Sequence, residues 1–150
     1  MNLLNKNTDY AVRAIVYLAG RKESVVSSRE ISERQDIPLH FVRRILQDLV
    51  REGYLVSREG AGGGVRLVKK PGDISVSELI ELYQGDIQIS ECMFRKRVCP
   101  NRSTCPLRKR LKKIEKKLAD EFRNITVRDL LEDTENTHEK KDNTNKREKV

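Results

Sequence analysis

The sequence predicts a mainly α protein with one small β-hairpin, and three observations lead to this fold class. A short helix with a capping signal is followed, after a tight turn, by a second amphipathic helix. Two short apolar strands then flank a loop with four glycines in six residues. A long helix with a narrow apolar stripe comes later in the chain. This order is typical of a winged helix-turn-helix domain followed by a long dimerisation helix.

The first three helices are predicted from apolar periodicity and from their start signals. Residues 8–20 form the first helix, because apolar side chains recur there at helical spacing. Ser27 and Glu30 form a capping box that begins a second helix, and this helix runs to about Gln35. The third helix has Pro38 as its first residue and ends before Gly53. One face of the third helix is apolar and consists of Val42, Ile45, Leu46 and Leu49.

The hairpin and the later helices are predicted in the same way. Residues 54–58 and 65–68 are two short strands, and the glycine-rich loop between them allows a close approach to another backbone. A helix with a second capping box runs from Ser75 to about Tyr83, and a weaker start signal occurs at Thr126.

A long helix is predicted from about Pro106 to Asn124. Its apolar stripe is narrow and its other faces are densely basic, which favours a seam between two subunits. Packing of the stripe onto the same chain is the alternative. The stripe consists of Leu107, Leu111, Ile114, Leu118, Phe122 and Ile125.

The composition favours a polyanionic partner. The chain has 31 Lys and Arg against 23 Asp and Glu, a net charge of +8 and a pI near 9.5. A surface that is merely basic and solvated is the alternative. Only 37% of the residues are hydrophobic, so that burial against a second subunit would help a thin core. We expect a cytoplasmic protein without a membrane span, because the sequence has no long apolar run and no apolar N-terminal stretch.

The third predicted helix carries the candidates for base recognition in double-stranded DNA. Its N-terminal part would face the base edges of the major groove. Arg43 or Arg44 is the stronger candidate, because a guanidinium group binds guanine in a bidentate fork. An exposed, solvated arginine face is the alternative. The full set of predicted DNA-binding residues is Ser28, Leu39, His40, Arg43, Arg44, Arg58 and Arg66.

Three cysteines, Cys92, Cys99 and Cys105, lie within one short segment with the spacing C-x6-C-x5-C. An odd cluster of thiols in a reducing compartment indicates a metal site before it indicates disulfides. Zinc sites usually use closer pairs of cysteines, whereas iron–sulfur clusters accept thiolates from longer loops. Zinc bound by the same three thiolates, and free buried thiols, are the alternatives. Four nearby cations would favour the thiolate form, namely Arg95, Lys96, Arg97 and Arg102.

A cluster held by three thiolates needs a fourth ligand from elsewhere in the sequence. Asp9 and Glu91 are candidates, and His40 is a weaker one. Asp9 also has a structural explanation, because an acid at the start of a helix interacts well with the helix dipole.

The sequence divides the chain into three regions. Residues 1–70 are a DNA-binding domain, residues 71–132 are a cluster-binding loop with the dimerisation helix, and residues 133–150 are a charged tail expected to be disordered.

The sequence resembles the Rrf2 family of bacterial transcription regulators over residues 1 to about 132. The resemblance rests on the N-terminal Thr8-Asp9-Tyr10, Arg13-Ala14 and Tyr17, on the wing residues Ser57, Gly60 and Gly62–Leu67, on the three cysteines before a long helix, and on residues 126–131. The N-terminal stretch and the wing are most similar to the nitric-oxide-responsive, NsrR-type branch. No single motif is decisive, but their combination in this order is highly specific.

This resemblance implies a homodimeric repressor that binds a roughly palindromic operator. It also implies a [4Fe–4S] or [2Fe–2S] cluster on Cys92, Cys99 and Cys105, with Asp9 of the partner subunit as fourth ligand. The IscR-type branch carries a ligating His three residues after the third cysteine, where this chain has Arg108. The wing departs from the family at Glu59, where many members have Arg.

We therefore expect the cluster to fix the two recognition helices of the dimer about one DNA turn apart. Nitrosylation or loss of the cluster would then weaken binding to the operator. Iron, redox state or cluster supply are alternative signals, and a zinc-stabilised regulator without a sensing role is a further alternative. An enzyme is not expected, because the sequence has no nucleotide or flavin motif and no plausible acid–base pair.

Overall fold

The computed structural model describes residues 3–21, 24–89, 93–94 and 97–147, with side chains described for 3–21, 24–89 and 98–137. The helices are α1 (Lys6–Ala19), α2 (Ser28–Gln35), α3 (Leu39–Arg51), α4 (Val76–Gln84), α5 (Pro106–Asn124) and α6 (Val127–Arg147), and a single 3-10 turn, η1, spans Pro71–Asp73. The strands β1 (Leu55–Arg58) and β2 (Gly64–Leu67) form one antiparallel hairpin, and β3 (Met93–Phe94) and β4 (Arg97–Val98) form another. The mainly α fold with a small hairpin is therefore confirmed.

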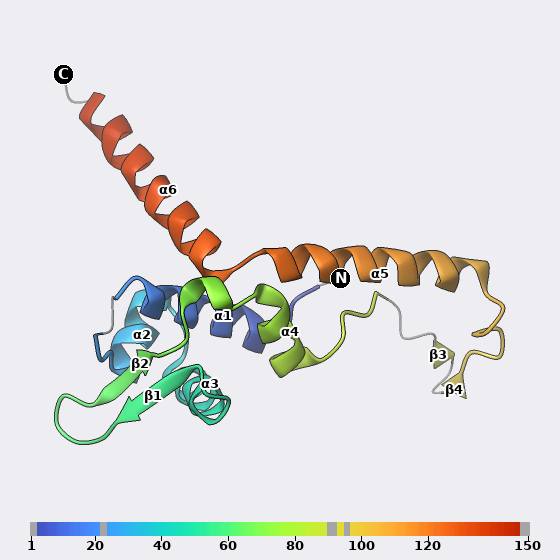
Figure 1. Cartoon of the computed structure of the whole chain (residues 1–150), viewed down its shortest axis with the longest axis horizontal. Helices are drawn as coiled ribbons and strands as arrows, with labels where there is room; N and C mark the ends of the chain where they lie inside the picture. Colours follow the sequence, from blue (N-terminus) through green and yellow to red (C-terminus); the bar gives the residue numbers. More distant parts are fainter. Residues whose placement is uncertain (1–2, 22–23, 90–92, 95–96, 148–150) are drawn as a thin grey trace.

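Helices α1, α2 and α3 enclose the core of the N-terminal part (Figure 1). The Ser27 hydroxyl accepts a hydrogen bond from the Glu30 amide at 3.1 Å, so the predicted cap begins α2. Asp36 then ends α2 in the left-handed conformation, with φ 51°. The predicted apolar face of α3 is buried, and Leu49 has no exposed surface. Burial of each such side chain stabilises the fold by about 1.5–3 kcal/mol.

Two helix starts differ slightly from the prediction. α1 begins at Lys6 rather than residue 8, because the Asn5 side chain caps it by accepting from the Thr8 amide at 2.8 Å. α3 begins at Leu39, and Pro38 is its N-cap with an extended ψ of 133°. Both differences lie within the usual uncertainty of helix ends.

The β1–β2 hairpin is the predicted wing, and it is fixed to the start of α2. Val26 and Val65 exchange two backbone hydrogen bonds of 2.9 Å each, which add a short bridge beside the hairpin. A Cβ on Gly64 would overlap the Val26 carbonyl and lie 2.9 Å from the Ser27 nitrogen. Only glycine therefore allows the wing to approach α2 this closely.

The starts of α4 and α6 are held side by side. The capping box of α4 is present: the Ser75 amide donates to the Glu78 carboxylate at 2.8 Å, and the Glu78 amide donates to the Ser75 hydroxyl at 3.2 Å. The Val127 amide donates to the Ile74 carbonyl at 2.9 Å, and both of these residues are fully buried.

Helix α5 has the predicted bounds and extends away from the N-terminal core (Figure 1). Its apolar stripe is partly uncovered within one chain, since Leu107 is 64% exposed and Ile114 is 47% exposed, whereas the other four stripe residues are half-buried. The one buried residue of α5 is Glu115, which lies off the stripe. None of the described helices is both long and apolar enough to cross a membrane.

Helix α6 continues to Arg147, through the region where the sequence predicts a disordered tail from residue 133. The Thr134 hydroxyl donates to the Leu130 carbonyl at 2.8 Å, and the Thr137 hydroxyl donates to the Asp133 carbonyl at 2.7 Å. These bonds satisfy threonine side chains within the helix, and Glu and Lys, which occur repeatedly here, have good helix propensity. The low apolar content that suggested disorder does not oppose a solvent-exposed helix.

Candidate DNA-binding face and cysteine segment

The outward side of α3 is polar and exposed, as a recognition helix requires. His40, Arg43 and Arg44 are exposed, and Leu39 is half-buried at the helix start. The imidazole of His40 lies against the ring of Phe41, with 4.3 Å between ring centroids. This contact limits the orientation of His40, whereas the two arginines extend from a fixed helix into solvent.

A groove of about 530 Å³ separates α3 from the wing. Arg43 lies on its α3 side, Arg58 lies on its wing side, and Ser28 lies at the adjoining start of α2. The structure therefore brings three of the predicted DNA-binding residues to one groove. The polar side chains that also line it but were not predicted as DNA contacts are those of Ser27, Gln47, Arg51 and Ser57. Helical spacing is the signal that identifies Gln47, because it lies four positions after Arg43 on the same face.

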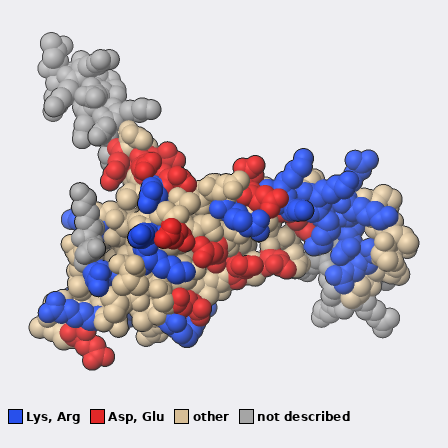
Figure 2. Space-filling view, viewed as in Figure 1, with Lys and Arg blue, Asp and Glu red and all other residues tan. Residues whose placement is uncertain are grey.

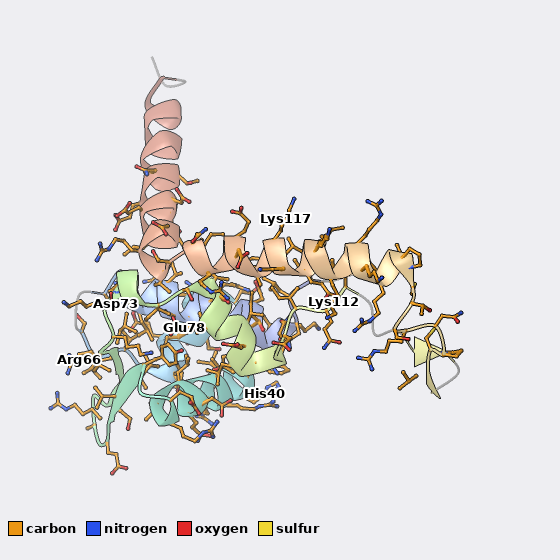
Figure 3. The ribbon with its side chains drawn as sticks, turned by 45° about the vertical axis from the view of Figure 1, so that its right-hand side comes forward. His40, Arg66, Asp73, Glu78, Lys112 and Lys117 are labelled. Atoms are coloured by element: carbon orange, nitrogen blue, oxygen red, sulfur yellow. The ribbon has the colours of Figure 1, made fainter. Side chains whose placement is uncertain are left out.

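The wing carries the other predicted contact, Arg66, which is half-buried on β2. Figure 3 shows Arg66 and His40 at opposite ends of the face formed by α3 and the wing. Glu59 is exposed in the loop after β1, whereas Arg58 lines the groove. Arg58 is therefore the basic residue of the wing that directly faces α3.

The positive charge of the groove comes mainly from Arg43 and Arg58. The Arg51 guanidinium lies 2.7 Å from the Asp48 carboxylate and 3.5 Å from that of Glu52. The hydrogen bond to Asp48 raises the pKa of Arg51 further, so its charge is permanent but locally offset. An anion in the groove would meet Arg43 and Arg58 without such neighbours.

The cysteine segment lies at the N-terminal end of α5, far from the wing (Figure 1). Cys99 and Cys105 are both free and half-buried, and Cys92 lies outside the described residues. A turn joins the two, in which the Cys105 amide donates to the Asn101 carbonyl at 2.8 Å and the Arg102 amide donates to that of Cys99 at 3.0 Å. Cys105 is the N-cap of α5, where the positive end of the helix dipole suits an anionic ligand.

Asp9 lies in the first turn of α1 and is exposed. Its carboxylate is 3.7 Å from the Arg13 guanidinium, one turn along the same helix. Among the residues that the structure describes, no three His, Cys, Asp or Glu side chains come close enough together to hold a metal ion. A single chain therefore does not bring Asp9 to Cys99 and Cys105. His40 lies on α3, and Glu91 lies outside the described residues.

The segment that leads to the cysteines is tied to α5 through Glu115. The Ile89 amide donates to the Glu115 carboxylate at 2.9 Å, and the Lys112 ammonium lies 2.7 Å from the same carboxylate. Glu115 is only 6% exposed. This role was not predicted from the sequence, since an acid among many lysines on a polar helix face is ordinarily solvated.

The comparison with known protein families agrees with this geometry. The model of the Rrf2 family, described as iron-dependent transcriptional regulators, matches residues 4–133. The chain belongs to the Rrf2 family. It is therefore a transcriptional regulator, and members of this family bind DNA and usually act as dimers.

Individual Rrf2 relatives are similar along most of their length. The transcriptional regulator NsrR of Bacillus subtilis is 28% identical over 134 residues, covering 88% of this chain and 92% of the relative. The solved structure of T. potens IscR has a TM-score of 0.72 and 26% identity, covering 89% of each chain. CymR, the global cysteine regulator of B. subtilis, has a TM-score of 0.71 and 21% identity, covering 88% of this chain and 98% of the other. These relatives are regulators rather than enzymes, and the winged-helix fold is shared.

Proposed function

We propose that this Rrf2 protein is a homodimeric repressor whose affinity for an operator is controlled by an iron–sulfur cluster, with nitric oxide as the signal. The observation that carries the DNA-binding part is the groove in which Arg43 of α3 and Arg58 of the wing face each other. Arg43 and Arg44 would read base edges, and Arg58 with the start of α2 at Ser28 would contact phosphates.

The dimer is proposed because α5 leaves part of its apolar stripe uncovered. Leu107 and Ile114 are among the most exposed large apolar residues of the described chain, at 64% and 47%. A groove of about 870 Å³ between α1 and α6, lined in part by Val16 and Leu131, offers further apolar surface elsewhere on the chain. Pairing of two such stripes would set the distance between the two α3 helices, which must lie about 34–36 Å apart to enter successive major grooves.

The donor chemistry of the cysteine segment fits an iron–sulfur cluster. Cys99 and Cys105 are free thiols joined by one turn, and Cys105 lies at the positive end of a long helix. Cys92 would be the third thiolate ligand. Asp9 would be the fourth ligand and would come from the partner subunit, because its exposed carboxylate lies on α1, remote from its own cysteine segment.

The residues of the chain have distinct parts in this switch. Cys92, Cys99 and Cys105 would hold the segment in one ordered arrangement, and Asp9 would connect it to the partner. When bound, the cluster supplies iron that reacts with nitric oxide. Release of these four ligands would free the segment and loosen the fixed spacing of the α3 helices, which weakens operator binding. Couplings of this kind are typically about 1–3 kcal/mol.

Anaerobic purification tests the cofactor. The protein is expected to be coloured and to contain iron and acid-labile sulfide, and native mass spectrometry should report a cluster-loaded dimer that changes on addition of nitric oxide. A colourless, iron-free protein that contains zinc, even after reconstitution, would instead support the zinc-stabilised regulator. A coloured protein that ignores nitric oxide but responds to iron or redox state would keep the cluster and replace the signal.

A pair of variants tests the link between cluster and DNA. Cys99→Ala is expected to abolish cluster binding while the protein remains a folded dimer with unregulated DNA binding. Ser103→Ala, in the same exposed turn, is the matched control and is expected to behave as the wild type. Operator binding that still responds to nitric oxide in Cys99→Ala would contradict the proposal.

A further inference from the structure

The C-terminal end of α4 is joined by side-chain hydrogen bonds to two other helices. The residues that make these bonds are its last two, Tyr83 and Gln84, which we call the α4 junction. Gly85 follows with φ +72°, a conformation that favours glycine, and begins the segment that leads to the cysteines. The junction therefore lies between the cysteine segment and the rest of the molecule.

Gln84 holds the N-terminal end of α1. Its side-chain oxygen accepts from the Asn5 amide at 3.0 Å and from the Thr8 hydroxyl at 2.8 Å. Its side-chain nitrogen donates to the Leu3 carbonyl at 3.0 Å. Thr8 has no exposed surface, and its hydroxyl also lies 3.1 Å from the Asn5 side-chain oxygen, so Gln84 and the N-cap of α1 share this buried hydroxyl.

The bonds of Gln84 fix the turn of α1 that carries Asp9. Asn5 is the N-cap of α1, and its side-chain amide also donates to the Tyr83 carbonyl at 3.1 Å. The Asp9 amide donates to the Asn5 carbonyl at 3.1 Å, the first backbone bond of the helix. A shift of the α4 junction therefore moves the helix cap, and with it the carboxylate of Asp9.

Tyr83 connects the same junction to the recognition helix. Its hydroxyl donates to the carbonyl oxygen of Ile45, in the middle of α3, at 3.1 Å. Ile45 is 2% exposed and lies on the inner side of α3, one residue after Arg44. The bond thus fixes the position of α4 relative to the helix that faces DNA.

The segment beyond the junction is short and anchored. Four residues separate Gln84 from Ile89, whose amide is bound by Glu115 of α5 at 2.9 Å. Cys92 follows three residues after Ile89. A rearrangement of the cysteines is therefore close, along the chain, to both the Glu115 anchor and the α4 junction.

We propose that Tyr83 and Gln84 are positioning residues that transmit the state of the cysteine segment to the DNA-binding face. Gln84 holds the turn that carries Asp9, and Tyr83 holds α3. This inference rests on the proposed function, because it assumes that the state of the cysteine segment changes DNA affinity. The bonds of both residues described above are to protein groups, so their substitution changes coupling rather than a DNA contact.

The decisive measurement is the ratio of DNA dissociation constants between the cluster-free and cluster-loaded forms. The probe is a duplex selected from a random-sequence pool by the wild-type protein. Tyr83→Phe and Gln84→Met remove hydrogen bonds with little change in volume, and each is expected to move this ratio toward one by about 3- to 10-fold. Tyr17→Phe is the matched control, since its hydroxyl donates to Glu30 at 2.8 Å away from the junction, and it should leave the ratio within about twofold.

Hydrogen exchange of the cluster-free protein gives a second, independent readout. Tyr83→Phe should accelerate exchange in α3 around Ile45, and Gln84→Met should accelerate it in the first turn of α1. A wild-type ratio of one overturns the proposed function together with this inference. If the wild-type ratio differs from one and both junction variants keep the wild-type ratio, only the role of the junction is overturned. The same holds if Tyr17→Phe lowers the ratio as much as the junction variants do.

Discussion

The close contact between the wing and α2 leads to a sharp prediction for Gly64→Ala. The added methyl group would overlap the Val26 carbonyl and lie 2.9 Å from the Ser27 nitrogen, and both of these are backbone atoms that cannot rotate away. The two 2.9 Å hydrogen bonds between Val26 and Val65 would then break or lengthen. At about 0.5–1.5 kcal/mol for each bond, the variant should lose about 1–3 kcal/mol of unfolding free energy.

DNA binding should fall in the same variant, because the wing and the start of α2 are displaced together. Urea unfolding measures the stability loss, and fluorescence anisotropy with a selected duplex measures the affinity. Val56→Thr is a suitable control, since Val56 pairs with Arg66 in the same hairpin, is 44% exposed and does not line the groove. If Gly64→Ala unfolds at the wild-type urea concentration and binds DNA normally, neither stability nor DNA binding requires the close approach of the wing to α2.

Three further predictions concern the dimer, the DNA contacts and the response to alkaline pH. Ile114→Glu should shift the protein to monomers in light scattering, whereas Lys117→Glu, on the same helix, should leave it dimeric. If both variants remain dimeric, the apolar stripe of α5 does not form the dimer interface. Arg43→Ala should lower the free energy of DNA binding by about 1–3 kcal/mol and relax base preference at one position of the site. Arg58→Ala should weaken binding to all DNA sequences alike and reduce the slope of log affinity against log salt concentration by about one. The same sequence and salt dependence in both variants would contradict these roles. Burial raises the pKa of the Tyr83 phenol above its ordinary value. The contribution of Tyr83 to the unfolding free energy is therefore complete below the unfolded pKa near 10 and is lost as pH rises further. Tyr83→Phe should flatten this alkaline decline in unfolding free energy, and an unchanged decline would exclude Tyr83 as its source.

The local parts of the fold were predictable from the sequence, because short-range chemistry determines them. Pro106 at the start of α5, and the Ser27 and Ser75 caps, each act within one helical turn. The buried face of α3 follows from 3.6-residue periodicity alone. The glycine-rich loop indicated the wing, although the particular need for glycine at Gly64 depends on a contact with the distant backbone of Val26 and Ser27 at the start of α2.

The connections between elements were not predictable in this way. The hydrogen bond from Thr8 to Gln84 joins residues 76 positions apart, and the bond from Tyr83 to Ile45 joins residues 38 apart. Such pairs have no periodicity in a single sequence, and each partner alone resembles an ordinary surface or core residue. The burial of Glu115 was missed for the same reason, because its partner is a backbone amide in another segment.

The distribution of charge changes the interpretation of the net +8. Helix α5 has eight basic and three acidic residues, a surplus of five, whereas residues 39–67 have five basic and three acidic residues, a surplus of two. Figure 2 shows the basic side chains gathered over the N-terminal half of α5, beside the cysteine segment. Most of the excess charge therefore lies away from the DNA-binding face, where it would offset the negative charge of thiolates rather than that of phosphates. Under the proposed function, affinity for DNA would therefore depend on a few placed arginines and on the spacing of two α3 helices, and a switch at the far end of α5 would act on that spacing.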